Sequence, residues 1–237
     1  MRFGVLFTVA VVMLKSQVSL GQLKFEAGVK AGFNYTNLDL SPVGRAAFVN
    51  AYHWKPSFHV GVYGLIKLPK AIGLDKFSIQ PEIVLSSQGQ RFTTDYNSDL
   101  RTSFYYVNVP LIIKYYLIGG LNLQFGPQIG ILAGSKGDLH QINNGNIVGP
   151  PIQNQPLKAY TNQTDFSLAF GTGIDLPFGG SLTVRYNLGI SDTNKFTNAS
   201  SLPANSIGPI SSSIGTSYAR NQVLQISFGY RLTKMKK

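Results

Sequence analysis

Few side chains of this chain are candidates for catalysis, and three of them share one face of two neighbouring predicted strands. Ser57 and His59 lie in the segment 57–68, and Glu82 lies in the segment 77–86. A hydroxyl, an imidazole and a carboxylate in contact can activate the hydroxyl as a nucleophile. Ser57 and His59 fall near one end of their strand, however, and register alone does not place Glu82 beside them. We therefore favour hydrogen-bonded polar side chains over a catalytic site.

Other kinds of site find little support. The chain has no cysteine, and its three histidines, His53, His59 and His140, lack the spacing of metal ligands. Gly171 and Gly173 lie in the string GTGID, inside a strand pattern with no helix following, so they do not form a dinucleotide-binding motif. The sequence predicts no metal site and no cofactor.

The elements that carry these residues are eight stretches in which apolar and polar residues alternate. The string SLTVRYNLGIS, residues 181–191, places Leu182, Val184, Tyr186, Leu188 and Ile190 on one face. The other stretches are 24–35, 57–68, 77–86, 104–117, 122–134, 165–176 and 223–232. The apolar parity of all eight carries no Lys, Arg, Asp, Glu or His. This pattern predicts eight two-faced β-strands.

Side-chain volume decides which face points outward. The interior of an eight-stranded barrel is just wide enough to be filled by side chains, and here the opposite parity is rich in glycine. The bulky apolar side chains must then point out, where lipid accepts them, and strands of about ten residues span the hydrocarbon layer. We predict an all-β fold, an eight-stranded antiparallel up-and-down transmembrane β-barrel. Pro81 and Pro127 lie on the outward parity, and we expect a bulge or a strand end near them.

The inward parity carries ten charged residues, six basic and four acidic. They are Lys24, Glu26, Lys30, Lys67, Glu82, Lys114, Asp165, Asp175, Arg185 and Arg231. Isolated charges in a narrow lumen are costly, so this near-balance predicts a paired polar network with a structural role that plugs the barrel. A water-filled lumen, and with it a small passive channel, is the alternative.

The connections between the predicted strands alternate in length. Residues 68–76, 118–121 and 176–180 are short turns, whereas residues 37–56, 89–103, 135–163 and 192–220 are long loops. This alternation is typical of the periplasmic turns and extracellular loops of outer-membrane barrels. In the first long loop, Arg45, Trp54 and Lys55 could contact lipopolysaccharide or a protein partner. An ordinary anchor role for Trp54 at the membrane interface is the favoured alternative.

The first 21 residues have the features of a cleaved signal peptide. Arg2 precedes an apolar run from Val5 to Leu14, and small residues stand before Gln22. We therefore expect a leader over residues 1–21 and a barrel domain over residues 22–237. Loss of Arg2 and Lys15 with the leader lowers the net charge from +11 to +9. A basic excess favours phosphate-bearing partners, and export makes lipid headgroups a better candidate than nucleic acid.

Five strings resemble one known family. YYVNVPLIIKYYL (105–117), FGPQIGIL (125–132), DFSLAFGTGIDL (165–176), LTVRYNLGIS (182–191) and NQVLQISFGYRL (221–232) resemble, in order and spacing, strands of the PorT-like outer-membrane β-barrel family of Bacteroidetes. The resemblance implies an eight-stranded barrel in the outer membrane and says little about activity. One departure is the end of the chain, where Leu232 is followed by Thr-Lys-Met-Lys-Lys instead of ending on an aromatic residue.

These observations predict a non-enzymatic protein of the bacterial outer membrane, reached after export to the periplasm. Its role would be structural or in protein interaction, with a link to secretion or another envelope function. The expected partners are outer-membrane lipid, lipopolysaccharide and envelope or secretion proteins, with no nucleic acid, and a monomer is favoured. A passive channel, a lipid-modifying outer-membrane enzyme and a secreted soluble lipocalin-like barrel are the alternatives.

Overall fold

A closed antiparallel barrel forms the body of the protein. The computed structural model describes residues 24–40, 52–69, 73–94, 98–143, 146–147, 152–158, 161–193 and 219–233. Its strands are β1 (Lys24–Leu40), β2 (Tyr52–His53), β3 (Lys55–Lys67), β4 (Phe77–Thr94), β5 (Ser98–Tyr116), β6 (Leu121–Asn143), β7 (Asn146–Ile147), β8 (Ile152–Pro156), β9 (Thr164–Asp175), β10 (Gly180–Gly189) and β11 (Ala219–Arg231). No helix in these ranges is long and apolar enough to cross a membrane.

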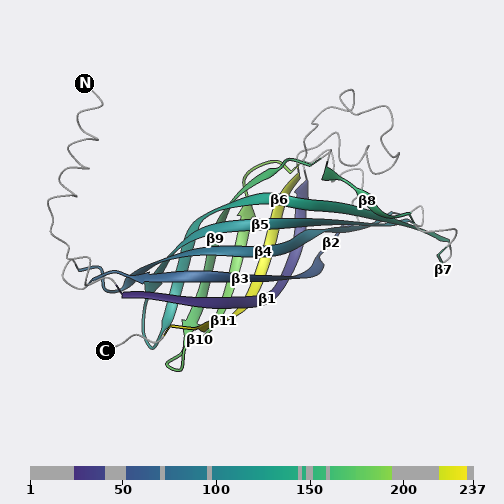
Figure 1. Cartoon of the computed structure of the whole chain (residues 1–237). Coiled ribbons are helices and arrows are strands. Elements are labelled where there is room, and N and C mark those ends of the chain that lie inside the picture. The colour runs from purple at the N-terminus through teal and green to yellow at the C-terminus, as the bar shows by residue number, and fades with distance from the viewer. Residues whose placement is uncertain are drawn as a thin grey trace, which may run out of the picture.

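Eight of the strands form the barrel wall. Each pairs with its neighbour along the chain, in the order β1, β3, β4, β5, β6, β9, β10 and β11, and the pairing of β1 with β11 closes the ring (Figure 1). Closure leaves no unpaired strand edge in the wall, as a bilayer requires. The predicted eight-stranded up-and-down topology is confirmed.

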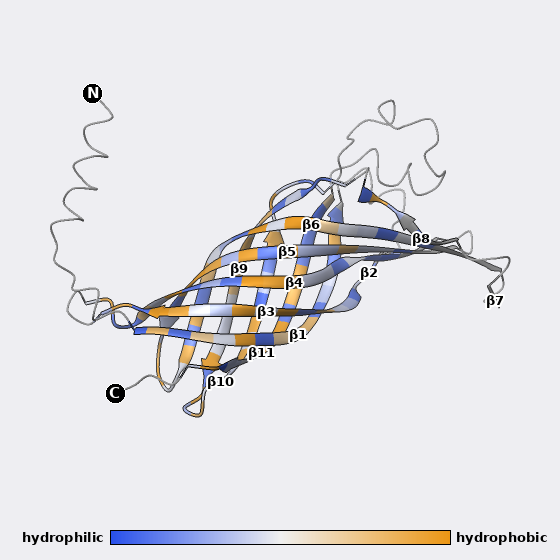
Figure 2. Ribbon diagram, in the orientation of Figure 1, coloured by the Kyte–Doolittle hydropathy of each residue, from blue (hydrophilic) through white to orange (hydrophobic). Residues whose placement is uncertain are grey.

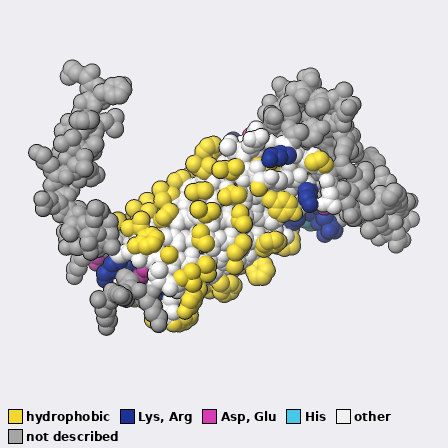
Figure 3. Space-filling model, in the orientation of Figure 1, with side chains coloured by type: hydrophobic (Ala, Val, Ile, Leu, Met, Phe, Trp, Pro, Cys, Tyr) yellow, Lys and Arg dark blue, Asp and Glu magenta, His cyan; other side chains and the backbone are white. Residues whose placement is uncertain are grey.

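The alternating sequence pattern determines which side chains face outward. Apolar residues of the predicted outward parity are exposed around the wall, for example Val62 at 52% and Ile129 at 46%. Figure 2 shows apolar and polar residues alternating along the strands in view, and Figure 3 shows apolar side chains gathered over the middle of the face in view. We call the exposed apolar residues of the eight wall strands the belt. Water would penalise such a surface, whereas hydrocarbon would not. The belt therefore marks the part of the wall that crosses the membrane.

Glycine on the inward parity lets neighbouring strands and side chains approach closely. A Cβ atom on Gly126 would lie 2.0 Å from the carbonyl oxygen of Leu111 and 3.0 Å from the Cα of Ile112. A Cβ on Gly28 would lie 2.4 Å from the ring of Tyr63. Small residues at these points keep the wall tight and leave the lumen to longer polar side chains.

The prolines interrupt pairing without ending their strands. The register of β4 with β3 is the same on both sides of Pro81, and that of β6 with β5 is the same on both sides of Pro127. Pairs are missing only locally, between Glu82 and Ile79 on β4 and between Phe125 and Gln128 on β6. The expected bulge or strand end is thus replaced by a local gap in the ladder, because proline removes one hydrogen-bond donor but can remain extended.

The strands continue beyond the belt, and this corrects parts of the predicted loops at 37–56, 89–103 and 135–163. β4 and β5 run on as a hairpin to Thr94 and Ser98, β6 continues to Asn143, and β2, β7 and β8 pair with this extension (Figure 1). The extension is polar on the side where the wall is apolar, so its sequence lacks the alternation that identifies a strand in lipid. Here the strands are held by cross-strand hydrogen bonds.

One β-bulge lies at the base of the extension. Tyr106 pairs with Leu132 and Tyr105 pairs with Gly134, so Ala133 has no partner on β5. The extra residue reverses the parity of β6 beyond this point. Odd-numbered residues such as Ile131 point outward below the bulge, and even-numbered residues such as Lys136 point outward above it.

Candidate functional site

The centre of the lumen holds a buried charged cluster around Glu82. Lys30 Nζ donates to Glu82 Oε2 at 2.9 Å, and the Arg185 guanidinium donates to both carboxylate oxygens at 3.1 and 2.9 Å. Gln80 Nε2 donates to Oε1 at 2.7 Å, and Arg185 also donates to Gln124 Oε1 at 2.9 Å. Lys30 lies on β1, Glu82 on β4 and Arg185 on β10, so these bonds cross the barrel from wall to wall.

The cluster excludes solvent at this level of the lumen. The side chain of Glu82 is 0% exposed, that of Arg185 is 1% exposed and that of Lys30 is 5% exposed. Buried charges are tolerated when they are paired and hydrogen-bonded, and the two-pronged contact of a guanidinium with a carboxylate is the strongest arrangement of this kind. The carboxylate therefore pairs with both cations that face it, and the three side chains together keep a net charge of +1.

The predicted Ser57, His59 and Glu82 are not brought together. His59 Nδ1 lies 2.7 Å from Asn34 Oδ1, and its Nε2 lies 2.8 Å from Ser227 Oγ. Ser57 Oγ donates to the carbonyl oxygen of Ser87 at 2.6 Å. Each polar group thus has a partner other than the one that nucleophilic catalysis needs. The three residues do not form a catalytic arrangement.

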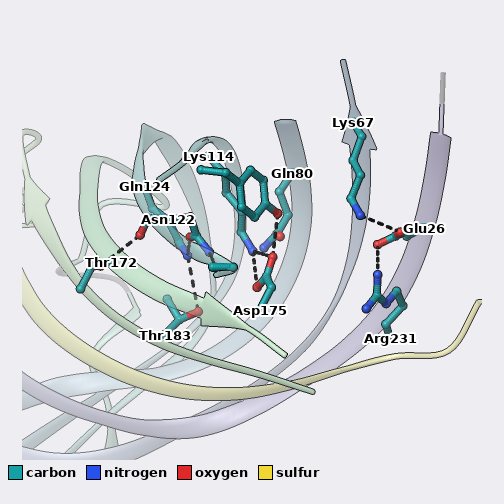
Figure 4. Close-up of polar contacts among 12 residues, drawn as sticks. Glu26, Lys67, Gln80, Lys114, Asn122, Gln124, Thr172, Asp175, Thr183 and Arg231 are labelled. Atoms are coloured by element: carbon teal, nitrogen blue, oxygen red, sulfur yellow. Dashed lines mark hydrogen bonds and ion pairs between the residues drawn. The ribbon is translucent and has the colours of Figure 1, made fainter. Parts of the chain in front are cut away.

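A second set of ion pairs lies at the end of the barrel with the short turns. Glu26 accepts a hydrogen bond from Lys67 at 3.0 Å and from Arg231 at 2.8 Å (Figure 4). Lys114 lies 3.2 Å from Asp175 Oδ1. These residues line a cavity of about 350 Å³ that opens at this end. The cavity is bordered by charges of both signs.

The last two residues of the predicted network occupy the two ends of the barrel. Asp165 accepts from Ser191 Oγ at 2.9 Å and from Asn221 Nδ2 at 3.2 Å. Lys24 is exposed at the start of β1. The sequence prediction did not single out uncharged residues of the network such as Gln80 and Gln124. Their position on the inward parity was the signal that could have identified them.

Lys55 and Trp54 contact neighbouring strands. The Trp54 ring stacks on Tyr35 with centroids 5.7 Å apart. Lys55 Nζ donates to the carbonyl oxygen of Thr102 at 2.9 Å and to Ser103 Oγ. Lys55 lies beyond the belt, and partial burial lowers its pKa, while Asp138 raises it and Arg101 lowers it. Arg45 lies outside the described residues, and a lipopolysaccharide contact through these three residues stays a prediction.

Comparisons with known proteins agree with this architecture. The family model for the outer membrane protein beta-barrel domain matches residues 15–195, which is more than half of the chain. The chain belongs to this family. The barrel is therefore a protein of the bacterial outer membrane, and the alternative of a secreted soluble lipocalin-like protein is wrong. Its apolar parity faces outward instead of filling a core.

Solved structures similar to this barrel have low sequence identity to it. Neisserial surface protein A (NspA) is 8% identical, with a TM-score of 0.45, and the match covers 87% of this chain and 98% of NspA. Ail, the attachment invasion locus protein of Yersinia pestis, is 10% identical, with a TM-score of 0.44, and covers 88% and 99% of the two chains. No curated protein matches the chain in sequence. Among the described residues no group of His, Asp and Glu could hold a metal ion.

Proposed function

We propose that this protein is a non-enzymatic, non-conducting outer-membrane barrel of a Gram-negative bacterium, with a structural or protein-interaction role in the envelope. The observation that carries this proposal is the Glu82 cluster. It connects β1, β4 and β10 across the lumen through hydrogen bonds of 2.9 to 3.1 Å. An open pore needs water along its axis, whereas the three charged side chains of this cluster are shielded from water.

The polar extension beyond the membrane favours an interaction role. β4, β5 and β6 carry a paired sheet away from the belt on the side of the long connections, which in outer-membrane barrels faces the exterior. A rigid sheet is a better platform for contacts than a disordered loop, because less conformational entropy is lost on binding.

We also propose that the protein belongs to the PorT-like group and carries a cleaved leader. Membership of the PorT-like group, and with it a contribution to protein secretion, is supported by five strings, residues 105–117, 125–132, 165–176, 182–191 and 221–232. The apolar run near the start of the chain supports a leader over residues 1–21. A deletion strain that secretes its usual set of proteins in normal amounts would contradict the secretion role and leave the barrel proposal intact.

Planar-bilayer recording tests whether the barrel conducts. Purified protein should give no discrete current steps, whereas the triple variant Lys30→Ala, Glu82→Ala and Arg185→Ala should give them, because removal of the three side chains leaves room for water. Lys76→Ala, in an exposed turn, is the matched control and should stay silent. Regular current steps from the unmodified protein would refute the proposal.

Envelope lipid analysis tests the absence of catalysis. Ser57→Ala and His59→Ala should each leave the lipid profile of the cell unchanged when the variants are folded and present at the usual level. A lipid species that accumulates in either variant, but not in a Ser191→Ala control, would identify the protein as a lipid-modifying enzyme.

A further inference from the structure

The cavity at the end of the barrel with the short turns has the size of a ligand site. Its volume of about 350 Å³ falls in the range of about 300–1,000 Å³ that is usual for small-ligand sites. Lys30 and Arg185 of the Glu82 cluster lie four residues further along β1 and β10 than Glu26 and Ser181 of the lining. That cluster therefore bounds the cavity inside the barrel. The cavity opens toward the periplasm, which the short turns of outer-membrane barrels face.

The charged residues of the lining form two groups on opposite walls. Glu26 on β1 accepts hydrogen bonds from Lys67 on β3 and Arg231 on β11, and both strands pair with β1. Lys114 on β5 pairs with Asp175 on β9, and β6 lies between these two strands. In the closed ring of eight, β6 is four strands away from β1 in either direction. Figure 4 shows the two groups apart from each other, so a ligand in the cavity would lie between them.

The charge of the lining suits a ligand with a single negative charge. Its described residues include three cations and two carboxylates, a net charge of +1. A carboxylate would balance this charge, whereas a phosphate group, at about −1.5 to −2, would exceed it. Lys67 and Arg231 each donate one hydrogen bond to Glu26, and an ammonium or guanidinium group has further N–H donors. Their side chains are 32% and 25% exposed, so a ligand can reach them.

The uncharged part of the lining suits an amide chain. It includes the hydroxyl groups of Tyr63, Tyr116 and Ser181 and the backbone of the turns at 119–120 and 179–180. Hydroxyl groups donate and accept hydrogen bonds, and turn backbone offers N–H and C=O groups. A peptide can pair with groups of both kinds, whereas the hydrocarbon chain of a fatty acid can pair with neither. The lining therefore favours a peptide over a lipid-derived carboxylate.

Two apolar side chains are exposed beside the opening. Ile118 is 87% exposed and Phe178 is 71% exposed, and each directly precedes a glycine of the lining, Gly119 or Gly179. A chain that is held in the cavity by one end would pass these side chains as it leaves. We propose that the cavity binds the C-terminal carboxylate of a short peptide in the periplasm, with the carboxylate at Lys67 and Arg231. This site goes beyond the proposed function and would remain if the barrel conducted, so the two proposals fail independently.

Calorimetric titration tests the site directly. The refolded protein in detergent micelles is titrated with N-acetyl-trialanine and with the C-terminal amide of the same peptide. The amide lacks the negative charge and should bind at least about tenfold more weakly, since hydrogen bonds between charged groups are among the strongest. This comparison uses the unmodified protein and does not depend on the folding of any variant. Equal binding of the two peptides would overturn the inference.

Two charge-removing substitutions locate the site. Lys67→Gln removes one cation of the lining and leaves Glu26 its bond with Arg231, so the variant should fold and bind the peptide about tenfold more weakly. Lys76→Gln removes an exposed charge in a turn at the same end, outside the lining, and should leave binding unchanged. Equal loss in the two variants would show a general charge effect and would overturn the inference.

Further ligands define what the site recognises. Acetate and inorganic phosphate should both bind more weakly than N-acetyl-trialanine, and equal or tighter binding of either would overturn the assignment to a peptide. A peptide carboxylate in the periplasm can come from the cell wall or from a protein. Tighter binding of the peptide with D-alanine in its last two positions would support a cell-wall stem peptide, and tighter binding of the all-L form would support a protein C-terminus. Absence of binding by both forms would overturn the inference.

Discussion

Replacing Glu82 with glutamine removes the negative charge at the centre of the lumen while keeping the shape of the side chain. In the unmodified protein this carboxylate accepts four hydrogen bonds, from Lys30 at 2.9 Å, from Arg185 at 3.1 and 2.9 Å, and from Gln80 at 2.7 Å. Glu82→Gln leaves the two buried cations facing each other without a counter-charge. The side-chain amide can accept at one oxygen only.

The expected loss is large. Breaking a buried ion pair by removing one partner costs about 3–5 kcal/mol, because an uncompensated charge stays buried. With a urea dependence of about 2 kcal/mol per molar, the unfolding midpoint should fall by roughly 2 M. The triple change Lys30→Met, Glu82→Gln and Arg185→Met removes all three charges. It should recover most of the loss, since apolar replacement of a buried charge cluster is often neutral or stabilising.

The chain carries its own reporter for this measurement. Trp54 is its single tryptophan and stacks on Tyr35 at the end of the wall, so its fluorescence should change when the barrel unfolds in lipid vesicles. Ser57→Ala, which alters a peripheral hydrogen bond, serves as the control. A Glu82→Gln variant within about 1 kcal/mol of the unmodified protein would refute the reasoning, because it would show that water already solvates the cluster.

Three further predictions concern the wall and the leader. Val62→Arg, in the middle of the belt, should lower the free energy of unfolding in vesicles by about 2–4 kcal/mol, whereas Ile118→Arg, in a turn, should cost about 0–1 kcal/mol; equal costs would place the belt outside the membrane. Gly126→Ala should cost about 1–3 kcal/mol by overpacking, whereas Gly134→Ala, whose Cβ would meet its nearest atom at 3.9 Å, should be neutral in the same urea titration. The mass of the protein purified from membranes should correspond to a chain that starts at Gln22, and a mass that includes residues 1–21 would disprove cleavage.

The sequence predicts the wall well because lipid imposes a simple rule. A strand with lipid on one side must alternate, and a single charge on the outward parity of residues such as Val62 or Ile129 would be costly. The eight strands, their order and the outward face could therefore be read directly, and the structure confirms them. Outer-membrane location followed from the same argument and is supported by the family match.

The sequence could not predict the contacts across the lumen or the extension above the membrane. Glu82 meets Arg185 across 103 residues of sequence, and nothing in the parity of either strand specifies that height. Beyond the belt the outward residues Arg91 and Arg101 are polar and exposed, and inward residues such as Gln90 are polar and buried, so the sequence shows no apolar alternation that would distinguish a strand from a loop. Register, which the sequence pattern does not supply there, places those two residues opposite each other.

The position of the bulge at Ala133 affects where this chain can change length. One inserted residue exchanges the two faces of everything that follows it on the same strand. Above Tyr105 the exchange costs less, since neither side touches hydrocarbon, whereas at Ile129 the same insertion would place polar side chains in the hydrocarbon and aliphatic side chains in the lumen. Laboratory libraries of single-residue insertions should therefore recover folded barrels from the upper half of β6 and lose them from its lower half.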